Sequence, residues 1–168
     1  DCTEENYFYS EYGEIPECIN TGVNEYRCLI KNEITSLANM FKDKTNLMSL
    51  DLSVLDSSKV TSMSYMFSGC SYLYYVNFNG FDTSQLTDIS YIFNDCVQLT
   101  SIDLEYFNTS QVTNMEGMFQ GCVLIVTIDL SNFNTNQIKN IGSMFNGCNR
   151  LESIDLSSFV TNQVQNKS

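Results

Sequence analysis

A single interval of 26 residues governs most of this chain. It separates the cysteines at positions 70, 96, 122 and 148, and it also separates Phe67, Phe93, Phe119 and Phe145. No insertion breaks the register, so each block is expected to be one structural unit stacked on an identical neighbour. The interval therefore predicts a solenoid over residues 33–168, with repeats near 47–72, 73–98, 99–124, 125–150 and a partial one at 151–168.

The first half of each repeat has the spacing of a short strand. In the third repeat, Leu99, Ile102, Leu104 and Phe107 follow the pattern LxxLxLxxF. Side chains of a strand point alternately to its two faces, so a strand around Ile102 to Leu104 would turn Ile102 and Leu104 inward.

The second half of each repeat changes rhythm. Met115, Met118, Phe119 and Cys122 stand at i, i+3, i+4 and i+7, which is the spacing of one face of a helix. Thr113 and Glu116 form a capping-box pattern. Gly121 lies where a left-handed helix stop is expected, as do Gly69 and Gly147, with Asp95 as the tolerable exception. The sequence thus predicts an α/β leucine-rich-repeat solenoid of about five strand-turn-helix repeats.

The repeat also resembles a known family. The run FDTSQLTDISYIFNDC, from Phe81 to Cys96, and its siblings are similar to the 26-residue leucine-rich repeats of BspA-like surface proteins, the mycoplasma-lipoprotein-type repeat family. The resemblance covers roughly residues 34 to 164. It implies an extracellular or cell-surface location and a non-enzymatic, adhesive role, and it carries over no catalytic residue.

Composition narrows the function further. Twenty acidic residues against eight basic ones give a net charge of −12, which repels a phosphate backbone and suits cations or basic partners. The chain contains no histidine, so serine–histidine and cysteine–histidine catalysis is excluded. No stretch approaches the roughly 18 apolar residues of a membrane helix. We therefore expect neither an enzyme, nor nucleic-acid binding, nor membrane insertion.

The cysteines fall into two groups. Cys70, Cys96, Cys122 and Cys148 each close the apolar face of a repeat, which favours buried free thiols over occasional bridging or a metal site. Cys2, Cys18 and Cys28 lie in an acidic, tyrosine-rich segment, residues 1–32, which we expect to cap the solenoid. Cys18 with Cys28 is the first expectation for a disulfide, and Cys2 with either is the alternative.

Two further kinds of site are suggested by the outward-facing positions. Asp103, Asp129 and Asp155 recur at the centre of successive strands and form a weak candidate ladder for a cation such as Ca²⁺, although a solvated polar face is the preferred interpretation and no cofactor is expected. Asn108 and Asn166 begin the two N-glycosylation sequons.

Two functions remain in competition. The first is a structural protein that assembles head-to-tail into a homo-oligomer or filament, because the last repeat stops before a cap. The contact would join Tyr7, Tyr9 and Tyr12 of one copy to the apolar residues of the last repeat in the next, namely Ile154, Leu156, Phe159 and Val164. The alternative is a surface adhesin that holds a host protein or glycan on its strand face or exposed tyrosines, such as Tyr72, Tyr74 and Tyr75. A local break in the uniform ladders would favour binding.

Overall fold

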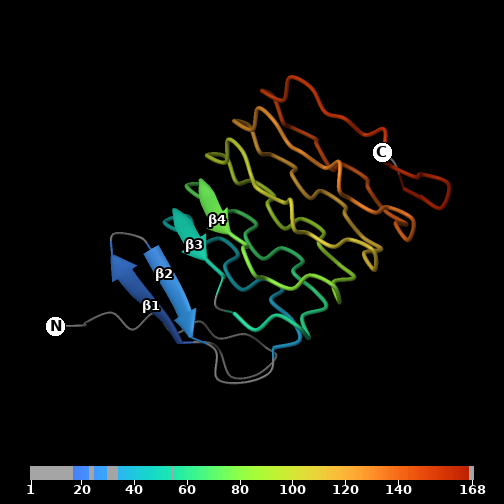
Figure 1. Ribbon diagram of the computed structural model, residues 1–168. Coiled ribbons are helices and arrows are strands. Elements are labelled where there is room, and N and C mark those ends of the chain that lie inside the picture. Colours follow the sequence, from blue (N-terminus) through green and yellow to red (C-terminus); the bar gives the residue numbers. More distant parts are fainter. Residues whose placement is uncertain (1–16, 23–24, 30–33, 54, 167–168) are drawn as a thin grey trace.

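The 26-residue interval becomes a stack of coils in space. The computed structural model describes residues 17–22, 25–29, 34–53 and 55–166. Figure 1 shows the coils piled one on another, from a hairpin at one end to the C-terminal coil at the other. A series of parallel bridges joins equivalent residues of successive coils: Ser36 to Ser62, then Asp88, Asn114, Asn140 and Asn166. The predicted solenoid is therefore present. We refer to 47–72, 73–98, 99–124, 125–150 and 151–166 as coils one to five.

Four strands form a sheet at the hairpin end of the stack. Strands β1 (Glu17–Gly22) and β2 (Glu25–Leu29) pair antiparallel, and β2 continues in parallel to β3 (Ser49–Asp51) and β4 (Tyr75–Asn77). Strand β2 thus takes the place that a coil strand would take, and the hairpin prolongs the sheet (Figure 1). The strand expected around Ile102 to Leu104 is not formed, since residues 100–104 have no strand assignment.

The prediction of a helix in the second half of each repeat is wrong. The second half of coils one to four is a run of turns, and the part of the chain that the structure describes contains no α-helix. In coil one, the N–H groups of Met63, Tyr65 and Phe67 donate to carbonyls of the next coil at 2.9–3.0 Å, whereas the intervening Met66 N–H donates to the Met63 carbonyl at 3.1 Å. Alternate N–H groups are thus used between coils, so a ladder of i to i−4 bonds cannot form.

Left-handed residues exclude the helix in a second way. Tyr65 and Gly69 in coil one, and Tyr91 and Asp95 in coil two, have φ between 55° and 76°. A left-handed residue at every fourth position interrupts any right-handed helix. The prediction of left-handed backbone at Gly69, Asp95, Gly121 and Gly147 is confirmed, but these residues shape turns and do not end helices.

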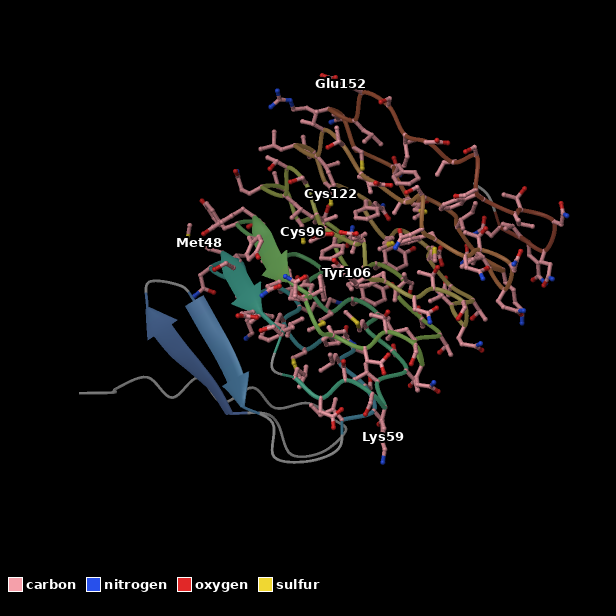
Figure 2. All side chains as sticks on the ribbon, viewed as in Figure 1. Met48, Lys59, Cys96, Tyr106, Cys122 and Glu152 are labelled. Carbon is pink, nitrogen blue, oxygen red and sulfur yellow. The ribbon has the colours of Figure 1, made fainter. Side chains whose placement is uncertain are left out.

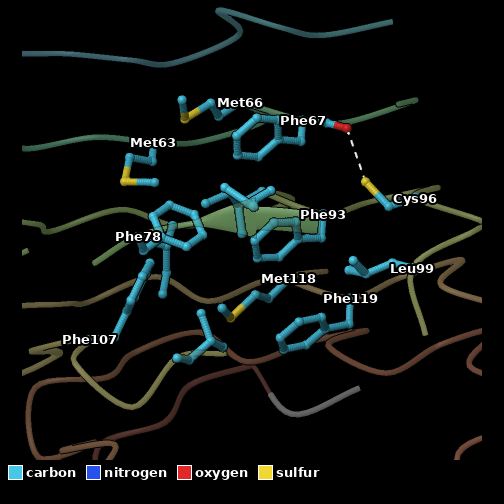
Figure 3. Close-up of a cluster of buried hydrophobic side chains, with 14 of the residues drawn as sticks. Met63, Met66, Phe67, Phe78, Phe93, Cys96, Leu99, Phe107, Met118 and Phe119 are labelled. Atoms are coloured by element: carbon cyan, nitrogen blue, oxygen red, sulfur yellow. Dashed lines mark hydrogen bonds between the residues drawn. The ribbon is translucent and has the colours of Figure 1, made fainter. Parts of the chain in front are cut away.

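Aromatic and sulfur-containing side chains fill the centre of the stack. The rings of Phe41, Phe67, Phe93, Phe119 and Phe145 form a column with centroids 5.7–6.0 Å apart and interplanar angles of 4–12°. Figure 3 shows the rings of Phe67, Phe93 and Phe119 in this column. Met115, Met118, Phe119 and Cys122 are completely buried, so the sequence spacing identified the inward face correctly although it named the wrong backbone. Such ring pairs add to the hydrophobic gain of burial.

Buried hydroxyl groups tie one coil to the next. Thr83 Oγ1 accepts a hydrogen bond from the Asn108 N–H at 2.7 Å, and Thr109 Oγ1 accepts one from the Asn134 N–H at 2.8 Å. Thr135 does the same for the Val160 N–H at 2.7 Å. Each threonine is at most 3% exposed, so these bonds lie away from competing water and fix the register between coils.

The last coil is less buried than the others. Ile154, Phe159 and Val164 are partly buried against the core, while Leu156 is 38% and Val160 is 43% exposed. The equivalent of Leu156 in coil four, Leu130, is 1% exposed.

Candidate functional site

The outward strand positions form a column of Asp51, Asn77, Asp103, Asp129 and Asp155, which we call the aspartate column. The Oδ1 atom of each accepts a hydrogen bond from the backbone N–H two residues later, at 2.8–3.0 Å. This arrangement is an Asx turn, in which a side chain replaces a backbone carbonyl. The column therefore has a structural role in closing one corner of each coil.

The same turn recurs at a second and a third corner. Asp56, Asp82, Asn108 and Asn134 accept from the N–H two residues on, and so do Asp88, Asn114 and Asn140. The outward Asp and Asn residues of the repeat are thus largely explained by backbone geometry.

Hydrogen bonds set the electrostatics of the aspartate column. Repulsion between like charges would raise the pKa of these carboxyl groups, yet the pKa of Asp129 lies below its usual value because the Ser131 N–H and hydroxyl hydrogen-bond the carboxylate. The Ser157 hydroxyl and N–H lower the pKa of Asp155 in the same way. Among the described residues, no group of three or more Cys, Asp or Glu side chains is placed to hold a metal ion. The cation ladder remains a prediction that no contact supports.

Among the described residues, the four most exposed aromatic side chains lie at the end of coil one, in coil two and in coil three. Tyr72, Tyr74, Tyr75 and Tyr106 are 51–66% exposed, and we call them the tyrosine patch. Figure 2 shows Tyr106 on the coil that follows β4. The positions equivalent to Tyr75 in coils one, three, four and five carry only Ser or Thr. Tyr75 is therefore a local departure from an otherwise uniform position of the repeat.

A small pocket opens between Tyr75 and Tyr106 of this patch. Its volume is about 50 Å³, and it lies between β4 with the turn after it and residues 103–107 of the next coil. The buried side chains of Val76, Phe78, Phe81 and Phe107 line it from inside, with Phe78 and Phe107 edge to face at 4.9 Å. Tyr75, Tyr106, Asn77, Asn79 and Asp103 complete the lining.

Sequence reasoning missed this pocket, although one signal was available. Gly80 stands in the column that holds Val54, Tyr106, Asn132 and Ser158, so coil two has no side chain beside Tyr106 at that place. Its φ of 81° also gives coil two a turn that a side chain would strain.

Two other tyrosines are structural. Tyr65 and Tyr91 stack at 4.7 Å with Lys42 Nζ 4.9 Å from the centre of the Tyr65 ring, and both are half-buried. A Cβ atom at Gly117 would collide with the Tyr91 ring, so glycine is needed there. These residues lie outside the tyrosine patch.

The repeat is shared with a described family. The family described as "Mycoplasma protein of unknown function, DUF285" matches residues 20–123 and 98–168. The chain belongs to this family. The repeat family that the 26-residue motif predicted is thereby confirmed. No curated protein matches the chain.

Solved structures similar to this DUF285 chain include three bacterial leucine-rich-repeat proteins. One from Eubacterium ventriosum has 18% identity and a TM-score of 0.47 over 73% of this chain and 29% of its own. One from Bacteroides ovatus has 14% identity and a TM-score of 0.47 over 95% and 53%. One from T. pallidum has 16% identity and a TM-score of 0.35 over 76% of each chain. The DUF285 chain thus spans about half, or less, of the first two.

The repeat cysteines of this DUF285 chain are free thiols that donate to the backbone. Cys70, Cys96 and Cys122 are buried, and Cys148 is half-buried. The Cys96 thiol donates to the Phe67 carbonyl at 3.2 Å (Figure 3), and the other three make the equivalent bond at 3.0–3.1 Å. Cys70, Cys96 and Cys122 thus have the burial that the sequence favoured for these residues, whereas Cys148 is buried less.

The remaining candidates are placed as follows. Strand pairing sets Cys18 opposite Cys28, and the disulfide itself remains a prediction. Asn108 is exposed, and its Oδ1 accepts from the Ser110 N–H at 3.0 Å. Asn166 pairs with Asn140, while the rest of its sequon, like Cys2, Tyr7, Tyr9 and Tyr12, lies outside the described residues. No helix in the described ranges is long and apolar enough to cross a membrane.

The aspartate column predicts a defined response to substitution and pH. Asp129→Asn should melt close to the parent at neutral pH, because Asn77 already makes the same turn. Asp129→Ala should melt lower, because the Ser131 N–H loses its acceptor. Since the folded-state pKa of Asp129 lies below 3.8, its contribution is complete above that value and is lost as pH falls through the folded-state pKa. Between about pH 6 and about pH 2, the melting temperature of the parent should therefore fall relative to that of Asp129→Asn. A difference in melting temperature that does not change with pH would contradict the lowered pKa of Asp129.

The different burial of the four thiols predicts that they react at different rates. Burial raises the pKa of Cys70 to about 12 and raises those of Cys96, Cys122 and Cys148 as well. In the folded protein at about pH 8, Cys148 should react with a disulfide reagent first, and Cys70, Cys96 and Cys122 should react only on unfolding. The Cys148→Ser variant removes the fast phase and serves as the control. Rapid labelling of Cys96 in the folded protein, located by mass spectrometry, would contradict this order.

Proposed function

We propose that this chain is a non-catalytic, cell-surface binding module that holds a protein or glycan partner on its tyrosine patch. One observation carries the proposal: Tyr72, Tyr74, Tyr75 and Tyr106 are more than half exposed, and Tyr75 and Tyr106 of successive coils line one pocket. Membership of the repeat family supports a module that works through its surface.

The exposure of these side chains has an energetic cost that the fold does not require. Tyrosine rings left in water forgo the gain of burial, and large exposed aromatic clusters on a protein mark contact surfaces. A tyrosine offers a broad apolar face with one polar tip, which suits recognition of both polypeptides and sugars. The strand face of the other coils carries small hydroxyl residues at the position of Tyr75, so the repeat does not demand an aromatic ring there.

The test removes the patch without touching the core. Wild-type protein should bind at least one of three immobilised probes: mucin, chitohexaose, or lysozyme as a basic protein. Replacing Tyr72, Tyr74, Tyr75 and Tyr106 by Ser should weaken that binding at least about tenfold. The matched control replaces the exposed Leu156 and Val160 of coil five by Ser and should bind like the wild type. Equal binding by the tyrosine variant and the wild type would overturn the proposal.

A second candidate is head-to-tail self-assembly. The observation that favours it is the apolar surface of coil five, where Leu156 and Val160 are exposed and Ile154, Phe159 and Val164 are partly buried. At the other end, β1 pairs on one side only within the described residues. Either a further coil or the hairpin of a second copy would cover these surfaces, and the second arrangement propagates as a filament.

The self-assembly candidate has its own test. If copies stack, sedimentation velocity should show species larger than a monomer that grow with concentration, and Leu156→Asp should return the protein to a monomer. The tyrosine variant should assemble normally. A wild-type protein that stays monomeric at about millimolar concentration would exclude the candidate.

A further inference from the structure

We infer that the pocket between Tyr75 and Tyr106 binds the guanidinium group of an arginine on a protein partner. This inference rests on the proposed function, because it takes the tyrosine patch as the binding surface and names what the patch recognises. Four features of the pocket support it.

The first feature is the charge of the surrounding face. The strand-face segments 48–53, 100–105, 126–131 and 152–157 carry acidic residues, and neither these segments nor 74–79 contain lysine or arginine. The acids are Asp51, Asp103, Glu105, Asp129, Glu152 and Asp155. A surface with one sign of charge attracts a partner of the other sign and speeds its association.

The second feature is the pair of aromatic walls. Tyr75 and Tyr106 both line the pocket and are 51% and 66% exposed, so their rings are open to a ligand. The faces of aromatic rings attract cations, and guanidinium is the side-chain cation that stacks best on them. A water molecule needs about 10–15 Å³, so a pocket of about 50 Å³ fits a side-chain head group and not a sugar chain.

The third feature is the carboxylate at the rim. Asp103 lines the pocket, and its Oδ1 accepts from the Glu105 N–H at 3.0 Å. An ionised carboxylate accepts about four hydrogen bonds, so one Asx-turn bond leaves capacity for an N–H donor. Asn77, beside it, donates its amide N–H to Asp51 at 3.1 Å. Asp103 thus supplies the charge that makes the pocket selective for a cation.

The fourth feature is the side chain that occupies the equivalent position between coils three and four. Asn132 is the counterpart of Tyr106, and its Nδ2 donates to the carbonyls of Leu104 at 3.0 Å and Glu105 at 2.6 Å. A nitrogen donor therefore already occupies that place between coils three and four. The Tyr106 side chain has no N–H to place between coils two and three, where the Gly80 turn also has a different backbone. The guanidinium group of the partner supplies the N–H donor at the corresponding position between coils two and three.

The experiment titrates the isotope-labelled full chain with the peptide acetyl-Gly-Arg-Gly-amide and follows amide shifts by NMR. The neutral control peptide has citrulline in place of arginine, which keeps the shape and removes the charge. We expect shifts centred on residues 75–79 and 103–107, with citrulline binding at least about tenfold weaker. Lysine in place of arginine tests the ammonium group and should bind more weakly, because it cannot stack as a plane.

Matched variants locate the site. Asp103→Asn keeps the Asx turn, as Asn77 does, and should weaken arginine binding about tenfold. Asp129→Asn makes the same change one coil away and should alter it less than about twofold. Tyr106→Ser should also weaken it. Equal effects of the two aspartate variants, or equal binding of arginine and citrulline, would overturn the inference.

The outcomes separate this inference from the proposed function. If the patch variant loses mucin, chitohexaose or lysozyme binding while the arginine peptide causes no shifts, the binding module stands and the guanidinium pocket is wrong. If the patch variant binds every probe as the wild type does, the proposed function itself is wrong.

Discussion

Hydrogen bonds between successive coils are the constraint on which the rest of this structure depends. Alternate N–H groups in the second half of coils one to three donate to carbonyls of the next coil, and parallel bridges tie equivalent residues from Ser36 to Asn166. Because each coil is bonded to its neighbour at many points, all coils must keep one length, and equivalent side chains fall into columns. The phenylalanine column, the thiol-to-carbonyl bonds and the Asx corners all follow from that register.

The columns of equivalent side chains could be predicted from the sequence, whereas the backbone conformation that connects them could not. The interval of 26 residues gave the stacking, the buried thiols and the inward positions of Met115, Met118, Phe119 and Cys122. The helix failed because i, i+3, i+4, i+7 spacing reports which residues face inward and not which hydrogen bonds the backbone makes. A run of turns with left-handed residues at every fourth position presents the same inward set. The left-handed tyrosines at 65 and 91 gave no warning, since only glycine and Asx residues usually mark that conformation.

From the sequence, the site could be predicted only as a surface with exposed tyrosines, without its pocket. The tyrosines of coil two stood out in the sequence, but the pocket forms only where Tyr75 of coil two meets Asp103 and Tyr106 of coil three. The aspartate column drew attention as a cation ladder because its charges recur, yet recurrence proved to reflect the turn that every coil makes. In a repeat protein, residues that obey the repeat serve the stack, and residues that depart from it are the better candidates for function.

The most direct test of the central claim is an NMR measurement of backbone conformation and amide exchange over residues 87–96 and 113–122. The coil structure predicts left-handed carbon shifts at Tyr91 and Asp95, and slow exchange for the N–H groups that bond between coils, including Ile89, Tyr91, Phe93 and Asp95. Uninterrupted helical shifts through either segment would contradict the alternating hydrogen bonds, and with them the column geometry that forms the tyrosine patch and its pocket.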